Sequence, residues 1–162
     1  MAKAREIRGL SCDEPFRSAA GKILWTRFEE LMSFREQVLK PVDARAAEEA
    51  VHDMRVASRR LRASLEVFVD VFPRAGFRNM LRSVKDLADT LGEVRDIDVL
   101  VDRLRASRKG KASTQRQALD SLIAEIEGNR DTARARLKTT IENLEQRDFP
   151  RRFALFVARE TV

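Results

Sequence analysis

One row of basic side chains has the residue types and the spacing to bind an extended anion. Its members recur at intervals of three or four residues: His52, Arg55, Arg59 and Arg62. At about 100° per residue, they fall within an arc of roughly 80° on one helix. Guanidinium groups suit phosphate because each can hold two oxygens at once and stays charged. The row spans about 15 Å along a helix axis, which favours several phosphates in a line over one small anion.

A second basic segment follows closely along the chain. It carries four positive charges with no acid between them, at Arg74, Arg78, Arg82 and Lys85. A helical hairpin would fold this segment back toward Arg62. The first row lies beside the apolar positions of its helix, so it would line a groove between helices, where a lower dielectric strengthens contacts to an anion.

The same residues also fit a purely structural role. After Lys85 the chain becomes acidic, with Asp86, Asp89, Glu93, Asp96, Asp98 and Asp102. Two antiparallel helices joined at residues 73–76 would bring opposite charges to the same level: Arg62 and Asp86, Arg59 and Asp89, Arg55 and Glu93, His52 and Asp96. A ladder of interhelix ion pairs is therefore the alternative to an open anion site.

Other kinds of chemistry have little support. We predict no catalytic residue, because the six Gly are scattered singly without a phosphate loop, and one His and one Cys form no clear pair of nucleophile and base. We predict no metal site and no cofactor, because His52 is the only histidine and no Cys/His cluster occurs. Nucleic acid is not expected as a partner, because nine Phe, one Trp and no Tyr offer no stacking surface for bases.

Composition favours one helical domain in the cytoplasm. The 162 residues are 36% charged and 43% hydrophobic with only four Pro, which is typical of long amphipathic helices. The net charge of +6 favours a polyanion as partner. The lone Cys12 suits a reducing compartment. No apolar run approaches the roughly 18 residues of a membrane span, so no membrane partner is expected.

Apolar residues at alternating spacings of three and four predict the helices that position these side chains. The predicted ranges are 16–39, 43–72, 77–108 and 114–146, and Pro150 allows a short final helix that turns Phe153, Phe156 and Val157 inward. Asp43 is the predicted N-cap of the second helix, and Thr114 with Gln117 that of the fourth. The predicted apolar seam of the fourth helix is Leu119, Leu122, Ile126, Ala133, Leu137, Ile141 and Leu144. Such helices bury their stripes only against one another, so we predict an all-α antiparallel four-helix bundle.

Two motifs give the chain a resemblance to a known family. Residues 51–62 (VHDMRVASRRLR) closely resemble the signature of the CHAD family, the conserved histidine α-helical domain. Residues 91–99 (LGEVRDIDV) resemble its second motif at the spacing that the family shows, and residues 148–156 resemble the segment that ends each half of its domain. The resemblance covers roughly residues 13–160.

The resemblance implies an all-helical domain that binds inorganic polyphosphate and is not an enzyme. By position, the family's basic residues match His52, Arg55, Arg59, Arg60, Arg62, Lys85 and Arg95. Together with Arg82 of the second basic segment, these are our candidate polyphosphate-binding residues. Some family members associate with polyphosphate granules, and others are fused or adjacent to triphosphate-tunnel hydrolases, which implies a granule location and a polyphosphate-metabolising enzyme as partner.

The chain resembles only half of the family's usual domain, which contains two similar four-helix halves around a positively charged channel. No second basic helix with a His-x-x-Arg pattern follows residue 62. We therefore expect residues 13–162 to form a half-domain, after a flexible N-terminus at 1–12, and two copies to pair as a homodimer that rebuilds the channel. The alternative is a protein-interaction or structural helical module whose basic row is neutralised internally.

Overall fold

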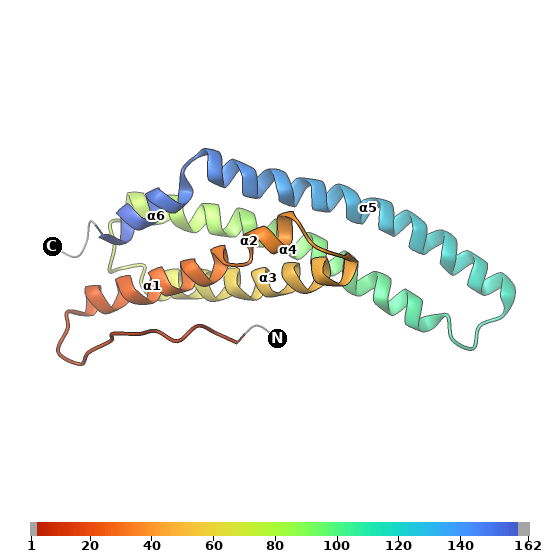
Figure 1. Cartoon of the computed structure of the whole chain (residues 1–162), viewed down its shortest axis with the longest axis horizontal. Coiled ribbons are helices and arrows are strands. Elements are labelled where there is room, and N and C mark those ends of the chain that lie inside the picture. The colour runs from red at the N-terminus through yellow and green to blue at the C-terminus, as the bar shows by residue number, and fades with distance from the viewer. Residues whose placement is uncertain (1–2, 159–162) are drawn as a thin grey trace.

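The computed structural model describes residues 3–158 of the chain, apart from the side chain of Ala75, as a bundle of helices. The elements are α1 (Phe16–Met32), α2 (Arg35–Leu39), α3 (Ala44–Val67), α4 (Arg74–Ser107), α5 (Ser113–Gln146) and α6 (Phe149–Ala158). No strand occurs among these residues. Figure 1 shows the long helices packed along one another with reversing direction. The predicted all-α antiparallel bundle is confirmed.

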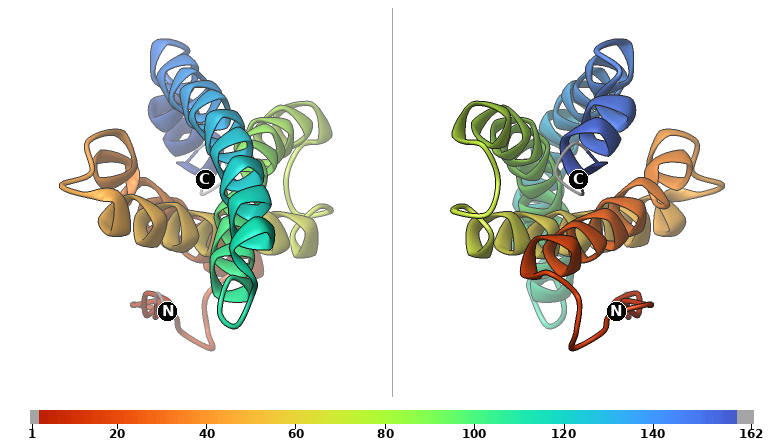
Figure 2. Two further views of the ribbon diagram at one scale, coloured as in Figure 1. Left: turned by 90° about the vertical axis from the view of Figure 1, so that its right-hand side faces the viewer. Right: turned by 90° about the vertical axis from the view of Figure 1, so that its left-hand side faces the viewer.

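The α4–α5 hairpin is the longest part of the molecule. Each of its helices has 34 residues, against 24 in α3 and 17 in α1, so its tip extends beyond the others (Figure 1). The end views in Figure 2 show the shorter helices gathered around the opposite end of this hairpin. None of the described helices is both long and apolar enough to cross a membrane.

Most apolar residues that the spacing places on the inner face of a helix are buried in the core. In α3 the residues that recur at three and four positions are buried: Val51, Met54, Ser58, Leu61 and Leu65. α4 continues through Gly92 as one helix, with Leu91 and Val94 buried on either side of it. Asp43 caps α3 as predicted, because its carboxylate accepts a hydrogen bond from the Ala46 backbone N–H at 2.8 Å. At the far end, α6 closes the bundle with Phe153, which stacks on Phe28 with ring centroids 4.4 Å apart.

The predicted helix at 16–39 is wrong in one respect, because it is interrupted at residues 33–34. The Ser33 hydroxyl donates to the Glu30 carbonyl at 2.8 Å, a local side-chain bond that competes with continued helix. The helix predicted at 43–72 ends at Val67, although Phe68 and Phe72 in the following turn are still buried.

The start and the seam of α5 also differ from the prediction. The helix begins at Ser113, with Ala112 at the N-cap instead of Thr114, and the Gln115 side chain accepts from the Ala112 backbone N–H at 3.3 Å. Leu122 was predicted at the seam but is 43% exposed, and Ile123 is buried in its place. α4 and α5 cross at an angle near the hairpin tip, as Figure 2 shows, so a different face of α5 meets its partner there.

The N-terminal segment runs back along the bundle in extended conformation (Figure 1). The Arg27 guanidinium donates to the Arg5 carbonyl at 3.0 Å, and the Lys22 amine donates to the Gly9 carbonyl at 2.5 Å. The boundary between residues 12 and 13 stays a prediction.

Candidate anion-binding groove

An open groove of about 360 Å³ runs between α3 and α4. Three arginines of the predicted row line it from α3, and its other wall is a stretch of α4. The lining residues are Arg55, Arg59, Arg62, Ala88, Asp89, Gly92, Glu93 and Asp96. The register that the short connection at residues 73–76 predicts therefore brings the basic and acidic segments together.

The ladder of ion pairs that the sequence allowed as the alternative is not found across this groove among residues 3–158. Among the described residues, Arg55 and Arg59 make no ion pair. Glu93 instead accepts two hydrogen bonds from Arg136 of α5, at 2.8 and 2.9 Å, and Arg62 lies 3.7 Å from Glu66 of its own helix. The groove thus holds three arginines and three carboxylates. Arg59, Asp89 and Asp96 are exposed and Arg55 is half-buried, and none of these four has a charged partner in the described part of the chain.

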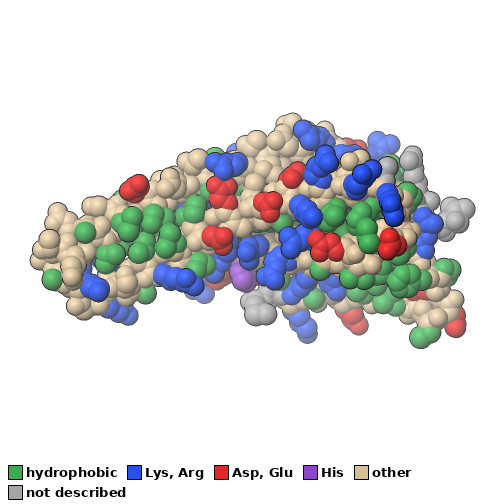
Figure 3. All heavy atoms as spheres, turned by 180° about the vertical axis from the view of Figure 1, so that it is seen from behind, with side chains coloured by type: hydrophobic (Ala, Val, Ile, Leu, Met, Phe, Trp, Pro, Cys, Tyr) green, Lys and Arg blue, Asp and Glu red, His purple; other side chains and the backbone are tan. Residues whose placement is uncertain are grey.

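The mixed charge is visible on the surface. On the face shown in Figure 3, Lys and Arg side chains gather around the single histidine and toward one end of the molecule, with carboxylates between them. The arginines that form no ion pair within residues 3–158 keep their positive potential and can attract an anion, with a strength that salt reduces.

Not every predicted site residue reaches the groove. His52 is half-buried one turn before Arg55, and it makes no hydrogen bond among the described residues. Lys85 is exposed on α4 outside the groove, and Arg95 is half-buried one turn after Gly92. Arg82 lines a different cavity, between α4, α5 and α6.

Arg60 faces α1 instead of the groove. Its guanidinium donates to Glu30 at 2.5 Å, and Arg27 holds the other oxygen of the same carboxylate at 2.7 Å. Glu30 is only 1% exposed, so the two arginines compensate a charge in the core. In the structure Arg60 joins two helices.

The sequence interpretation missed a buried carboxylate, Asp98 of α4, which is 1% exposed. Its nearest cations are Arg134 at 3.5 Å and Arg130 at 4.0 Å, both on α5, and neither of its oxygens accepts a hydrogen bond from the described residues. Burial raises the pKa of Asp98, although these two arginines and Arg95 act in the opposite direction. The sequence did contain a signal, because Asp98 lies four residues after Val94 and three before Val101, both of which are buried.

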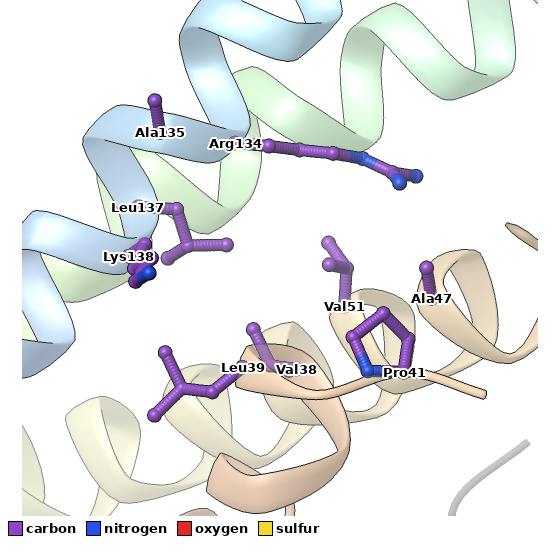
Figure 4. A pocket seen from close by; sticks show the side chains of 9 residues that line it. All are labelled: Val38, Leu39, Pro41, Ala47, Val51, Arg134, Ala135, Leu137 and Lys138. Carbon is purple, nitrogen blue, oxygen red and sulfur yellow. The ribbon is translucent and has the colours of Figure 1, made fainter. Parts of the chain in front are cut away.

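Arg134 also borders an apolar cavity of about 220 Å³. Figure 4 shows its side chain extending from α5 into the gap above α3, while Val38, Val51 and Leu137 line the cavity nearby. The Arg134 side chain therefore borders the apolar cavity and also brings its guanidinium to 3.5 Å from the Asp98 carboxylate. Within the described residues, no three His, Cys, Asp or Glu side chains lie close enough together to share a metal ion.

Comparison with known proteins adds one finding to this geometry. A family model described as the CHAD domain matches residues 22–162. This range includes the whole of the groove and both of its helices. No curated protein and no solved structure matches the chain.

Proposed function

Since the chain belongs to the CHAD domain family, we propose that its α3–α4 groove binds linear inorganic polyphosphate. CHAD domains are known in polyphosphate-related proteins. The observation that carries the proposal is that Arg55 and Arg59, on an open groove, form no ion pair with any residue that the structure describes. Both guanidiniums are available to hold phosphate oxygens in charge-assisted hydrogen bonds.

The geometry of the row supports a chain-like ligand. Arg55, Arg59 and Arg62 follow one stripe of α3 and span about 10 Å along its axis. Asp89 and Asp96 on the opposite wall repel an anion, so the ligand lies against the arginine side of the groove. A polymer that repeats its charge along its length uses such a row better than a single phosphate does.

We propose further that binding is not accompanied by catalysis. The sequence holds neither a glycine-rich phosphate loop nor a clear pair of nucleophile and base. Incubation of the purified protein with long-chain polyphosphate is expected to release no inorganic phosphate above the rate in buffer. Release that depends on protein concentration would contradict this part of the proposal.

The proposal extends to assembly and location. Because the chain resembles half of a two-half domain, we propose that two copies form a homodimer that rebuilds the channel. We propose the cytoplasm, at polyphosphate granules, as the site of action, with a polyphosphate-metabolising enzyme as partner.

The first test is a titration of the purified protein with long-chain polyphosphate and with duplex DNA of matched charge, at two salt concentrations. We expect polyphosphate binding to persist at the higher salt while DNA binding is lost, because purely electrostatic association weakens steeply with salt. Equal and equally salt-sensitive binding to both polymers would favour the alternative, an interaction module whose net charge of +6 attracts any polyanion.

The second test replaces the unpaired arginines. We expect Arg55→Gln with Arg59→Gln to lower polyphosphate affinity by about tenfold or more, because each change removes a charge-assisted contact. Thermal unfolding is expected to stay unchanged, because neither side chain makes an ion pair in the described part of the chain. Arg103→Gln with Arg116→Gln is the matched control, since both residues are exposed and the change in net charge is the same.

A further inference from the structure

A further cavity, of about 420 Å³, lies where α4, α5 and α6 meet. Three arginines that are far apart in the sequence converge on it: Arg82 from α4, Arg147 at the end of α5 and Arg152 from α6. Asparagine and serine or threonine side chains complete most of its wall, and Asp86 is the one carboxylate among its lining residues, all of which the structure describes.

The sharp turn between α5 and α6 explains how the arginines meet. Asp148 adopts a left-handed conformation with φ of 50°, which reverses the chain directly after Arg147. The Arg152 backbone N–H then bonds to the Asp148 carbonyl at 3.0 Å. Because Phe149 and Phe153 are buried, α6 is anchored, and the position of Arg152 is determined by that packing.

The three guanidiniums have no carboxylate partner in the part of the chain that the structure describes. Among the described residues, Arg82, Arg147 and Arg152 make no ion pair. Nearby carboxylates are already paired with other cations: Glu142 with Lys138 at 3.8 Å, Glu145 with Arg35 at 2.6 Å and Asp148 with Arg151 at 3.7 Å. With Asp86 as its only carboxylate, the cavity carries a positive excess that the α3–α4 groove, with three carboxylates, lacks.

We infer that this cavity, here termed the junction pocket, binds a phosphate group of the polymer as a second anchoring point. The choice of ligand rests on the proposed function, which the inference deepens. Arginine forks match phosphate oxygens bidentately, and the amides of Asn79 and Asn143 can donate to the remaining oxygens.

The two sites lie along one edge of α4. Arg82, Asp86, Asp89 and Glu93 follow one another at four, three and four residues, and so share a stripe of the helix. Arg82 and Gly92 are about 15 Å apart along the axis. A long polyphosphate chain can contact both the groove and the junction pocket, whereas inorganic triphosphate is too short to occupy both.

The test compares three double variants: Arg147→Gln with Arg152→Gln for the junction pocket, Arg55→Gln with Arg59→Gln for the groove, and Arg103→Gln with Arg116→Gln as control. Each removes two positive charges. Affinity for long-chain polyphosphate and for inorganic triphosphate is measured by calorimetric titration. Circular dichroism melting confirms that each variant folds.

We expect the junction-pocket variant to lose about tenfold or more of its affinity for long-chain polyphosphate, with little change in the control. If only the groove variant loses affinity for long-chain polyphosphate, the junction pocket is overturned and the proposed function stands. Loss in the junction-pocket variant alone would overturn the groove and keep the second site. Equal small losses in all three would overturn both, and a junction-pocket loss confined to triphosphate would overturn anchoring of the polymer.

Discussion

Arg59 and Arg60 are neighbours in the sequence, but the helix turns their side chains about 100° apart. Arg59 lines the groove and makes no ion pair in the described residues, whereas Arg60 holds the buried Glu30 of α1. Adjacent arginines in one basic segment therefore have different roles. One arginine is available to a ligand, and the other compensates a charge in the core.

This division predicts opposite effects for two similar substitutions. We expect Arg60→Gln to lower the free energy of unfolding by about 2 kcal/mol, because Glu30 keeps only Arg27 as a partner. Arg59→Gln is expected to change it by less than about 0.5 kcal/mol while weakening polyphosphate binding. Urea denaturation and polyphosphate titration of both variants measure the two effects. Equal destabilisation by the two changes would contradict the assignment.

Asp98 predicts a pH dependence of stability. Burial raises the pKa of its carboxyl above the ordinary value of 3.8, despite Arg130 and Arg134 on α5 and Arg95 on α4, and Asp102 acts in the same direction as burial. The folded state thus holds the proton more tightly than the unfolded state. The stability from this group is fully present below the unfolded pKa and is lost as pH rises through the folded pKa.

Urea denaturation between pH 4 and pH 7 measures the free energy of unfolding of two proteins, the unsubstituted chain and the Asp98→Asn variant. The asparagine does not titrate, so the difference in unfolding free energy between the two proteins isolates Asp98. We expect the unsubstituted protein to lose stability relative to the variant as pH rises. A difference that stays constant or changes in the opposite direction would show that the ion pairs with α5 outweigh burial.

Within single helices, the surroundings of each glycine show whether the helix has room for a larger side chain at that position. A side chain added at Gly128 in α5 would meet no atom within 4 Å, whereas one added at Gly21 in α1 would lie 3.3 Å from Val157 of α6. A larger side chain would therefore fit at Gly128 without contact, but would press on α6 at Gly21.

We expect Gly128→Ala to raise the free energy of unfolding by about 0.5–1 kcal/mol, because alanine has the higher helix propensity and the space is open. Gly21→Ala is expected to gain less or to destabilise, since Val157 must move. Thermal and urea denaturation of the two variants provide the comparison. A larger gain at Gly21 than at Gly128 would show that the contact between α1 and α6 is loose.

The molecule as a whole leaves apolar side chains on its longest element. Leu100 of α4 is 44% exposed and Leu122 of α5 is 43% exposed, both on the hairpin that extends beyond the other helices. Exposed apolar side chains of this kind are available for association with another chain. The homodimer itself is proposed from the half-domain resemblance.

We expect size-exclusion chromatography with light scattering at micromolar concentration to give twice the chain mass of 18.6 kDa. Polyphosphate that bridges both copies is expected to shift the equilibrium further toward the dimer, because a ligand stabilises the state that it binds best. A monomer mass with and without polyphosphate would contradict the homodimer and would leave binding by a single copy to be judged from the titrations.

The spacing of apolar residues was enough to predict the helical bundle and most of its core. Helix phase is a local property, so Met54, Leu61 and Leu91 could be placed inside from spacing alone. The connection between α3 and α4, predicted at residues 73–76 and found at 68–73, is short, and it also determined which segments of the two helices meet. The break at Ser33 and the exposure of Leu122 could not be predicted, because they depend on a local hydrogen bond and on the angle at which two helices cross.

Which charges remain available to a ligand depends on the tertiary structure. Glu93 is taken by Arg136 from a third helix, and this leaves Arg55 without the partner that the two-helix register predicts. Arg82 meets Arg147 and Arg152 only because the chain reverses at Asp148. Ion pairs form between side chains that packing brings within a few ångströms of each other. Such side chains are often far apart in the chain, so the spacing of residues along one helix does not predict which of them will pair.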